Sequence, residues 1–407
     1  MRVIILTIVT LIITSISVFG QIDTSANKYI ESELVSLAGK NGISWKSPAG
    51  DFLFKPYVLI QTRLCGKYYD DEGLNLAEQD NILNSGFGIP YALVGFAGKA
   101  FGKITYNLAI NSAATGAALL NQAWFDINMR DEFRIRIGKF KTPFTQAYLV
   151  RLGQTLFQIP TMSLTTRVNL PFDINSVNPK IATGFDIGLQ FHGIFYNKLE
   201  YRLAVFNGTG IGVNLPKNTM SDDLGIPSLL YAARVAYMPF GKIPLHQGDP
   251  TDLNGNYLSI ASSISYNVEA NFESSNDLRY GFEISYMHKR LYMSAEAYMM
   301  NMDFVERQQI QDNYTYSGMY LQAGYFVTKR IQPALRLDIM DRNSRKEDGI
   351  LYMPALGLNY YVMNHNLKIQ AMYQYLGKNG HIDKFHSDDD DNGLPEHMIC
   401  VQLQFAF

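Results

Sequence analysis

Apolar and polar side chains alternate along most of this chain. Between residues 399 and 407, Ile, Val, Leu and Phe occupy every second position, and Cys, Gln and Ala lie between them. The stretches 331–339, 367–375 and 185–192 show the same alternation. Because successive side chains of a β-strand point to opposite faces, this period of two predicts strands with one apolar and one polar face.

The alternation predicts sixteen strands, and the connections between them differ in length. The predicted strands are 52–67, 89–100, 102–113, 119–130, 132–141, 182–195, 199–208, 228–239, 256–268, 278–288, 290–301, 316–328, 330–341, 350–363, 366–377 and 396–407. Tight links alternate with long ones at 68–88, 142–181, 209–227, 302–315 and 378–395, and only 240–255 is longer than its place in the series predicts. Short turns at one end and long loops at the other are typical of an outer-membrane β-barrel. A soluble β-sandwich, the alternative, has no reason for an even strand count or for this asymmetry.

The composition favours a chain that shows much of its strand surface to lipid. Charged residues make up 18% of the 407 residues, and 26 Tyr and 24 Phe accompany 2 Trp. So many aromatic residues exclude a disordered chain. The balance of 35 Lys+Arg and 37 Asp+Glu gives a net charge of −2, which argues against a nucleic-acid partner. Beyond the first twenty residues no apolar run of 18 residues occurs, which excludes a helical membrane protein.

The N-terminal residues predict an exported protein. Residues 1–20 combine Arg2, an apolar stretch and a small-residue end, the pattern of a secretory signal peptide; a membrane-anchor helix is the alternative. Residues 21–50 are then a periplasmic N-terminal extension, and 51–407 form one transmembrane barrel. The terminal Phe407 on an amphipathic last strand fits the signal that barrel-assembly machinery recognises.

Several segments resemble one known family in their order and spacing. They are 138–144 (GKFKTPF), 205–210 (VFNGTG), 234–241 (RVAYMPFG), 321–326 (LQAGYF) and the terminal Phe407. Over roughly 50–407 the chain resembles the phosphate-selective porin O and P family. The resemblance implies a sixteen-stranded barrel in the bacterial outer membrane, usually a homotrimer, with the third external loop folded into the pore. In this chain that loop is 142–181, which is also the longest connection. The implied function is passive diffusion of small solutes, with a preference for anions.

Inward-facing positions carry more basic than acidic residues. Rows of Arg and Lys in a low-dielectric wall favour anions, and the planar guanidinium suits phosphate. The alternative is that each inward Arg pairs with a carboxylate and stiffens the wall. The candidate pore-lining and anion-binding residues are Arg63, Arg134, Arg136, Lys141, Arg151, Arg167, Arg202, Arg234, Arg336 and Lys368. The third loop offers only Arg151, Arg167 and Lys180, unlike the dense basic cluster of the family, so we predict a moderate anion preference in which phosphate specificity stays open.

Two further features are candidate sites. Asp388, Asp390 and Asn392 match the opening of an EF-hand loop, but Ile399 stands where the bidentate Glu belongs, so a solvated loop is the alternative to cation binding. Cys65 lies late in the first strand and Cys400 early in the last, and both alternate inward. A disulfide across the closing seam is therefore a hypothesis, with free thiols as its alternative.

Catalytic signatures are weak. The seven His show no H-E-x-x-H spacing, and no G-x-S-x-G occurs; His192, near Asp186, is the closest candidate. We expect no enzyme and no cofactor. A barrel-type outer-membrane enzyme and a surface adhesin or assembly protein are the alternatives to the porin, and ion current through the purified protein separates them.

Overall fold

The computed structural model describes residues 43–69, 84–161, 163, 184–209, 214–215, 228–268, 275–304, 313–341, 344–345, 350–378 and 396–407. The strands are β1 Trp45–Lys46, β2 Leu53–Tyr69, β3 Asn84–Ala100, β4 Ile104–Asn111, β5 Leu120–Arg130, β6 Phe133–Lys141, β7 Phe185–Phe195, β8 Leu199–Phe206, β9 Leu230–Tyr237, β10 Asn256–Asn267, β11 Ser275–His288, β12 Leu291–Phe304, β13 Tyr314–Tyr325, β14 Ile331–Asp341, β15 Ile350–Met363, β16 Leu367–Lys378 and β17 Glu396–Ala406. The short helices are η2 Gly116–Leu119, α3 Gln146–Leu149 and η3 Leu152–Gln154.

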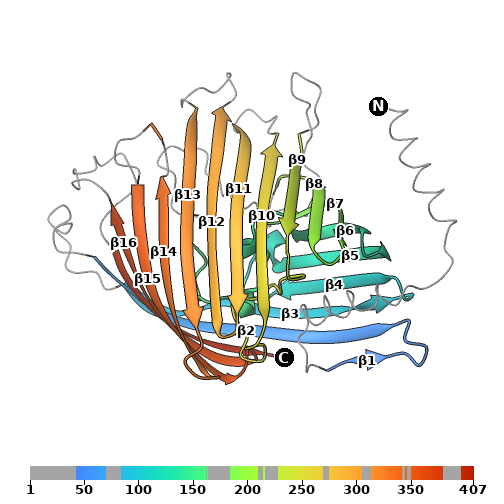
Figure 1. Cartoon of the computed structure of the whole chain (residues 1–407), viewed down its shortest axis with the longest axis horizontal. Helices are drawn as coiled ribbons and strands as arrows, with labels where there is room; N and C mark the ends of the chain where they lie inside the picture. The colour runs from blue at the N-terminus through green and yellow to red at the C-terminus, as the bar shows by residue number, and fades with distance from the viewer. Residues whose placement is uncertain are drawn as a thin grey trace.

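The strands form one antiparallel sheet that closes on itself. Each strand from β2 to β16 pairs with the next in the chain, and β17 pairs back with β2 over residues 59–69. Figure 1 shows the result as a barrel, with β10 to β16 on the near side and the C-terminus at its lower end. The closed barrel of sixteen strands, β2 to β17, confirms the fold class predicted from the alternation.

The strand β1 was not predicted. Its residues pair with Leu53 and Phe54 at the start of β2, below the point where β17 ends. Trp45 packs on Phe54 with ring centroids 5.7 Å apart, and Phe54 stacks on Phe96 at 5.2 Å. The two-residue strand is too short to carry an alternating pattern, so tertiary contacts and not local sequence define it.

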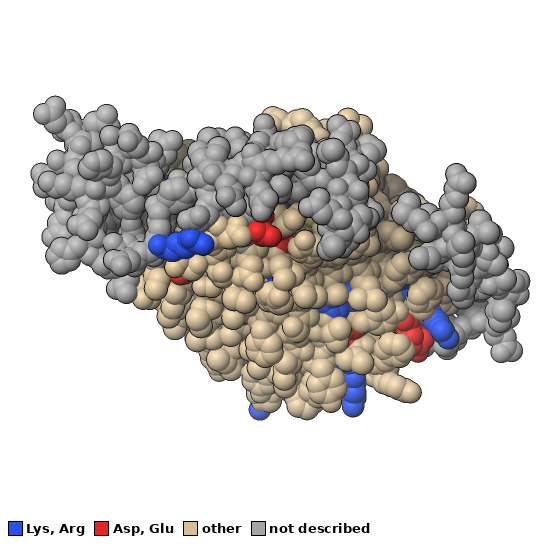
Figure 2. All heavy atoms as spheres, turned by 90° about the horizontal axis from the view of Figure 1, so that it is seen from above, with Lys and Arg blue, Asp and Glu red and all other residues tan. Residues whose placement is uncertain are grey.

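The two faces of the sheet have opposite character. On β14, Leu335 and Leu337 point outward and are 61% and 44% exposed, whereas Gln332 and Arg336 point into the lumen and are buried. Other strands repeat this arrangement, and most of the described surface in Figure 2 carries no charged side chain. Because water cannot satisfy polar groups in a bilayer core, an apolar outer face and closed hydrogen bonding suit a membrane-spanning barrel. No helix among the described residues is long and apolar enough to cross a membrane.

The two ends of the barrel differ in the length of their connections. At the short-turn end, Tyr196 and Asn197 both adopt positive φ, of 51° and 56°, as the two central residues of a type I′ hairpin turn do. The connection between β9 and β10 is the exception at this end, since it runs from residue 238 to 255. Strand lengths also vary: β2 and β3 have 17 residues, while β4, β8 and β9 have 8.

Candidate functional site: the barrel lumen

Lumen-facing arginines of β6, β8, β9 and β11 form ion pairs. Arg136 Nη2 lies 2.6 Å from Asp126 Oδ2, and the same carboxylate contacts His192 Nε2 at 3.0 Å. Arg234 Nε lies 2.6 Å from Glu283 Oε1. The remaining pairs are Arg134–Asp131, Arg202–Glu200, Arg234–Glu200 and Arg279–Asp277. These guanidinium charges are balanced by adjacent carboxylates, so on this part of the wall the arrangement matches the wall-stiffening alternative.

Between β6 and β7, the third-loop segment (residues 142–161) runs across the lumen. It contains α3 and η3, and side chains of β2, β14, β15, β16 and β17 donate hydrogen bonds to its carbonyls. These bonds join Gln61 to Leu152 O, Gln404 to Gly153 O, Lys368 and Gln370 to Thr155 O, Asn359 to Leu156 O, Arg63 to Gln158 O and Arg336 to Ile159 O. The carbonyl groups of the third-loop segment have no strand partner, and side chains of the wall satisfy their hydrogen bonds, as buried peptide groups require.

Carboxylates of the wall accept hydrogen bonds from backbone amides of the same loop. Gln146 N donates to Glu283, and Ala147 N donates to Glu296 Oε1 at 2.8 Å. Glu283 and Glu296 lie opposite each other on β11 and β12. Further along, Ser163 N donates to Asp338 Oδ1 at 3.3 Å. The loop is therefore held by acids through its amides and by bases and amide side chains through its carbonyls.

Apolar contacts fix the same segment. Leu156 and Phe157 belong to a buried cluster with wall residues from six strands of the barrel, among them Tyr292 and Met372. The Arg336 guanidinium carbon lies 4.5 Å from the centroid of the Phe157 ring. This side of the lumen is packed like the interior of a globular domain.

Of the candidate bases on the third loop, the structure describes Arg151. Its Nη2 is buried and makes no hydrogen bond within the described residues. The Arg151 charge lies close enough to act on both Lys55 and Lys141. Lys141 Nζ itself donates to Tyr148 O and Val150 O at 2.7 Å. Three cations thus lie along one side of the third-loop segment.

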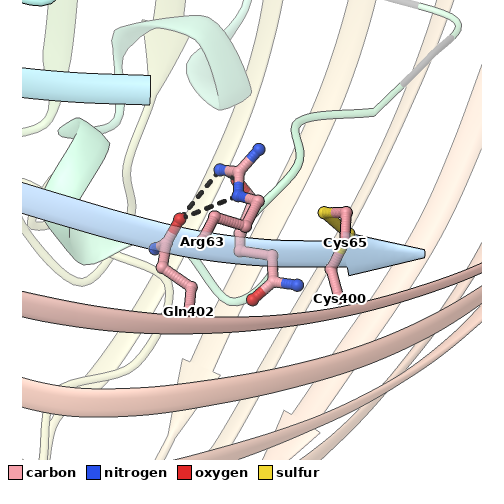
Figure 3. Close-up of a disulfide and its surroundings, with 5 residues drawn as sticks. Arg63, Cys65, Cys400 and Gln402 are labelled. Carbon is pink, nitrogen blue, oxygen red and sulfur yellow. Dashed lines mark hydrogen bonds between the residues drawn. A yellow bond between two sulfur atoms is a disulfide. The ribbon is translucent and has the colours of Figure 1, made fainter. Parts of the chain in front are cut away.

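Cys65 and Cys400 are joined by a disulfide that bridges β2 and β17 (Figure 3). Their Cα atoms are 4.2 Å apart, and the two residues are direct partners in the strand register. Two residues before Cys65, Arg63 donates from Nε and Nη2 to Gln402 Oε1 at 3.1 and 2.8 Å, as Figure 3 shows. A covalent and a polar link therefore lie side by side on the lumen face of the seam.

The candidate anion-binding residues thus fall into three groups. Arg134, Arg136, Arg202 and Arg234 pair with carboxylates, while Arg63, Lys141, Arg336 and Lys368 donate to the loop backbone. Arg151 forms the third group. Their role toward anions stays a prediction. Arg167, Lys180 and the acidic loop with Asp388, Asp390 and Asn392 lie outside the described residues, as do the predicted signal peptide and most of the N-terminal extension. Within the described part of the chain, no three His, Cys, Asp or Glu residues group as a metal site.

Sequence reasoning missed two sets of functional contacts. The lumen amides Gln61, Gln370 and Gln404 donate to the third-loop segment, but no local pattern shows that they bind a loop more than 90 residues away in the chain. The connection 238–255 also contacts the third-loop segment. Its unusual length was the signal, although length alone could not show where the connection folds.

A closed barrel with an apolar exterior, a polar lumen and a chain segment crossing that lumen defines a protein of the porin type. The family model "Phosphate-selective porin O and P" matches residues 63–407. The fold of this chain is similar to that of an anion-selective porin from Comamonas acidovorans. The TM-score is 0.61 and the sequence identity 12%, and the match covers 88% of this chain and 100% of that one. The fold is also similar to that of outer-membrane OmpT of Vibrio cholerae, with a TM-score of 0.53 and 9% identity, covering 90% of this chain and 100% of that one.

A curated relative is an uncharacterised protein of Aquifex aeolicus, 23% identical over 301 residues, which are 70% of this chain and 67% of that protein. The solved structures, at these identities, show the fold. The family model spans more than half of the chain. The chain belongs to the phosphate-selective porin O and P family, and it is a multi-pass β-barrel porin of the bacterial outer membrane.

Proposed function

We propose that this porin is a passive channel for small solutes with a moderate preference for anions, and that it catalyses no reaction. Family membership supports passage of solutes. His192, the histidine nearest to a catalytic arrangement, is 2% exposed and contacts Asp126, which Arg136 also holds. A buried imidazole that is hydrogen-bonded to a wall carboxylate serves the wall and not a substrate.

The observation that carries the anion preference is the charge along the third-loop segment. Lys141, Arg151, Arg63, Arg336 and Lys368 all lie on this segment or donate to its backbone. None of the five has a carboxylate within ion-pair distance among the described residues, whereas arginines elsewhere on the wall do. Cations in a narrow, low-dielectric passage attract anions, because the wall focuses their field on the passing ion. The anion-selective neighbour in the fold comparison agrees with this direction.

The direct test is the reversal potential in planar bilayers across a KCl gradient. The wild type should show chloride permeating faster than potassium. Arg151→Gln should reduce this ratio, and Arg151→Lys should keep most of it because the charge stays. Lys329→Gln is the matched control, since it removes one positive charge from an exposed turn between β13 and β14. Cation preference in the wild type would overturn the proposal.

Phosphate is expected to pass as one anion among others. Of the three bases on the third loop, the structure describes only Arg151. Adding phosphate to a chloride-filled channel should leave the chloride current unblocked at concentrations well below that of chloride. A saturable block at micromolar phosphate would instead establish a dedicated phosphate site.

We further propose a homotrimer embedded in outer-membrane lipid and inserted by the barrel-assembly machinery. Strands β4, β8 and β9 have 8 residues each, which at about 3.4 Å per residue and a tilt of about 40° reach roughly 21 Å. This is less than the apolar band of about 25 Å typical of such barrels, so neighbouring subunits would shield the wall at these short strands. Native mass spectrometry from detergent tests the stoichiometry, and a monomer under gentle conditions would contradict it.

A further inference from the structure

The connection between β9 and β10, here called the long turn (residues 238–255), folds into the lumen from the short-turn end. Ile243, His246, Gln247 and Gly248 are all buried. Gly241 and Gly248 adopt φ of 96° and 100°, which lets the chain double back at both places. A turn that stayed at the rim would expose these residues, so the long turn forms part of the lumen.

The long turn contacts the third-loop segment through backbone and side chain. Gln247 N donates to Gln154 O at 2.9 Å, and Leu156 N donates to Gln247 Oε1 at 2.7 Å. Arg151 N also faces Leu245 O at 3.5 Å. Gln247 therefore binds the loop on both sides of residue 155, in the way that a strand partner would.

The same turn is fixed to the wall. His365, in the turn between β15 and β16, donates from Nε2 to Gly248 O at 3.0 Å. Ile243 lies in the buried cluster that contains Leu156 and Phe157 of the loop. The long turn thus lies between the wall and the loop and contacts both.

We propose that the long turn is the support that sets the position of the third-loop segment, and that Gln247 is its positioning residue. The third loop enters the lumen from the long-loop end of the barrel, opposite to the long turn. How far it reaches into the lumen therefore depends on its contact with the long turn. The turn thereby sets the cross-section left for solutes. This inference rests on the porin function.

Loss of the Gln247 acceptor leaves the buried Leu156 amide without a partner. Such a loss should shift the equilibrium between seated and displaced loop by roughly tenfold. The backbone bond from Gln247 N remains in any variant, so the loop loosens and the barrel keeps its fold.

The experiment compares three variants in single-channel recordings and in liposome swelling with uncharged sugars of graded size. Gln247→Met keeps the volume and removes the acceptor, Gln247→Glu keeps an acceptor oxygen, and Gln190→Met is the control. Gln190 is another buried lumen-facing amide, and neither its Oε1 nor its Nε2 has a hydrogen-bond partner within the described residues. Uncharged sugars separate pore size from pore charge. Heat-modifiable migration on gels checks that each barrel is folded.

Gln247→Met should admit larger sugars and raise the ratio of time spent in a wider state to time in the base state by roughly tenfold. Gln247→Glu and Gln190→Met should behave as the wild type does. A second variant, with residues 243–248 deleted, should widen the pore further. Unchanged sugar exclusion in both Gln247→Met and the deletion would overturn the inference while leaving the porin function intact. Absence of any wild-type current would instead count against the porin function itself.

Discussion

The disulfide across the seam offers the sharpest stability prediction. Cys65 and Cys400 are 335 residues apart in the chain, so their bond closes almost the whole barrel into one covalent loop. Loop-closure entropy for this length corresponds to about 6 kcal/mol of stabilisation through the unfolded state. The paired strands β2 and β17 keep the seam closed in the folded state without it. We therefore expect the variant Cys65→Ser/Cys400→Ser to fold and to lose about 3–6 kcal/mol in the free energy of unfolding.

The assay is equilibrium unfolding in urea, with the protein in lipid vesicles and the fluorescence of Trp124 as the probe, in a Trp45→Phe background because Trp45 also emits. Trp124 lies on β5, away from the seam, and is 5% exposed, so it reports unfolding of the barrel as a whole. The loss should appear as a lower urea midpoint with an unchanged slope. The wild type treated with reductant should match the double variant, which should itself be insensitive to reductant. Equal midpoints for oxidised and reduced wild type would refute the loop-entropy reasoning.

Three further changes test the lumen. Arg234→Met should cost about 3–5 kcal/mol in urea unfolding, because it leaves the buried Glu283 carboxylate without its ion pair; a midpoint equal to the wild type would contradict this. Gly248→Val should displace the long turn and admit larger sugars, since a Cβ there would lie 2.4 Å from Gln332 Nε2 at a φ of 100°; unchanged exclusion would speak against the docked turn. Burial under the long turn lowers the pKa of His365 to about 3, below the value near 6.5 of a free imidazole. His365 therefore binds a proton more readily when the long turn is displaced. Docking should therefore be complete above pH 6.5 and weaken as the pH falls toward 3, seen as growing current noise. His365→Gln should reduce this dependence, and His246 on the long turn, whose pKa burial also lowers, should account for the remainder.

The barrel could be predicted from the sequence because its signal is local. Spacing alone predicts which residues of β14 face outward and which face the lumen. In the structure, Leu335 and Leu337 are exposed, and Gln332 and Arg336 are buried, as this spacing predicts. The pairing of first and last strands follows from closure, which is why the sequence could suggest which cysteines lie together. Trp45 and Lys46 form a strand only because the edge of β2 at Leu53 and Phe54 is not paired with β17. A two-residue segment carries no pattern that could predict this pairing.

The lumen could be predicted only in composition. The alternation places Arg234 inward, but its partner Glu283 is 49 residues away and is reached by way of β10, so register and rotamer decide the contact. The same holds for Arg63, whose guanidinium reaches Gln158 O of a loop that local rules cannot route. A count of inward bases and acids therefore estimates the charge of the lumen. The function of a single base depends on which groups, distant in the sequence, the fold places beside it.

The third-loop segment touches both sides of the seam. Leu152 O accepts from Gln61 on β2, Gly153 O accepts from Gln404 on β17, and the two glutamines bond each other at 2.8 Å. These contacts cannot all form until the first and last strands have met. Full seating of the loop consequently requires that the sheet has closed. The pore therefore acquires its final width only after the first and last strands have paired.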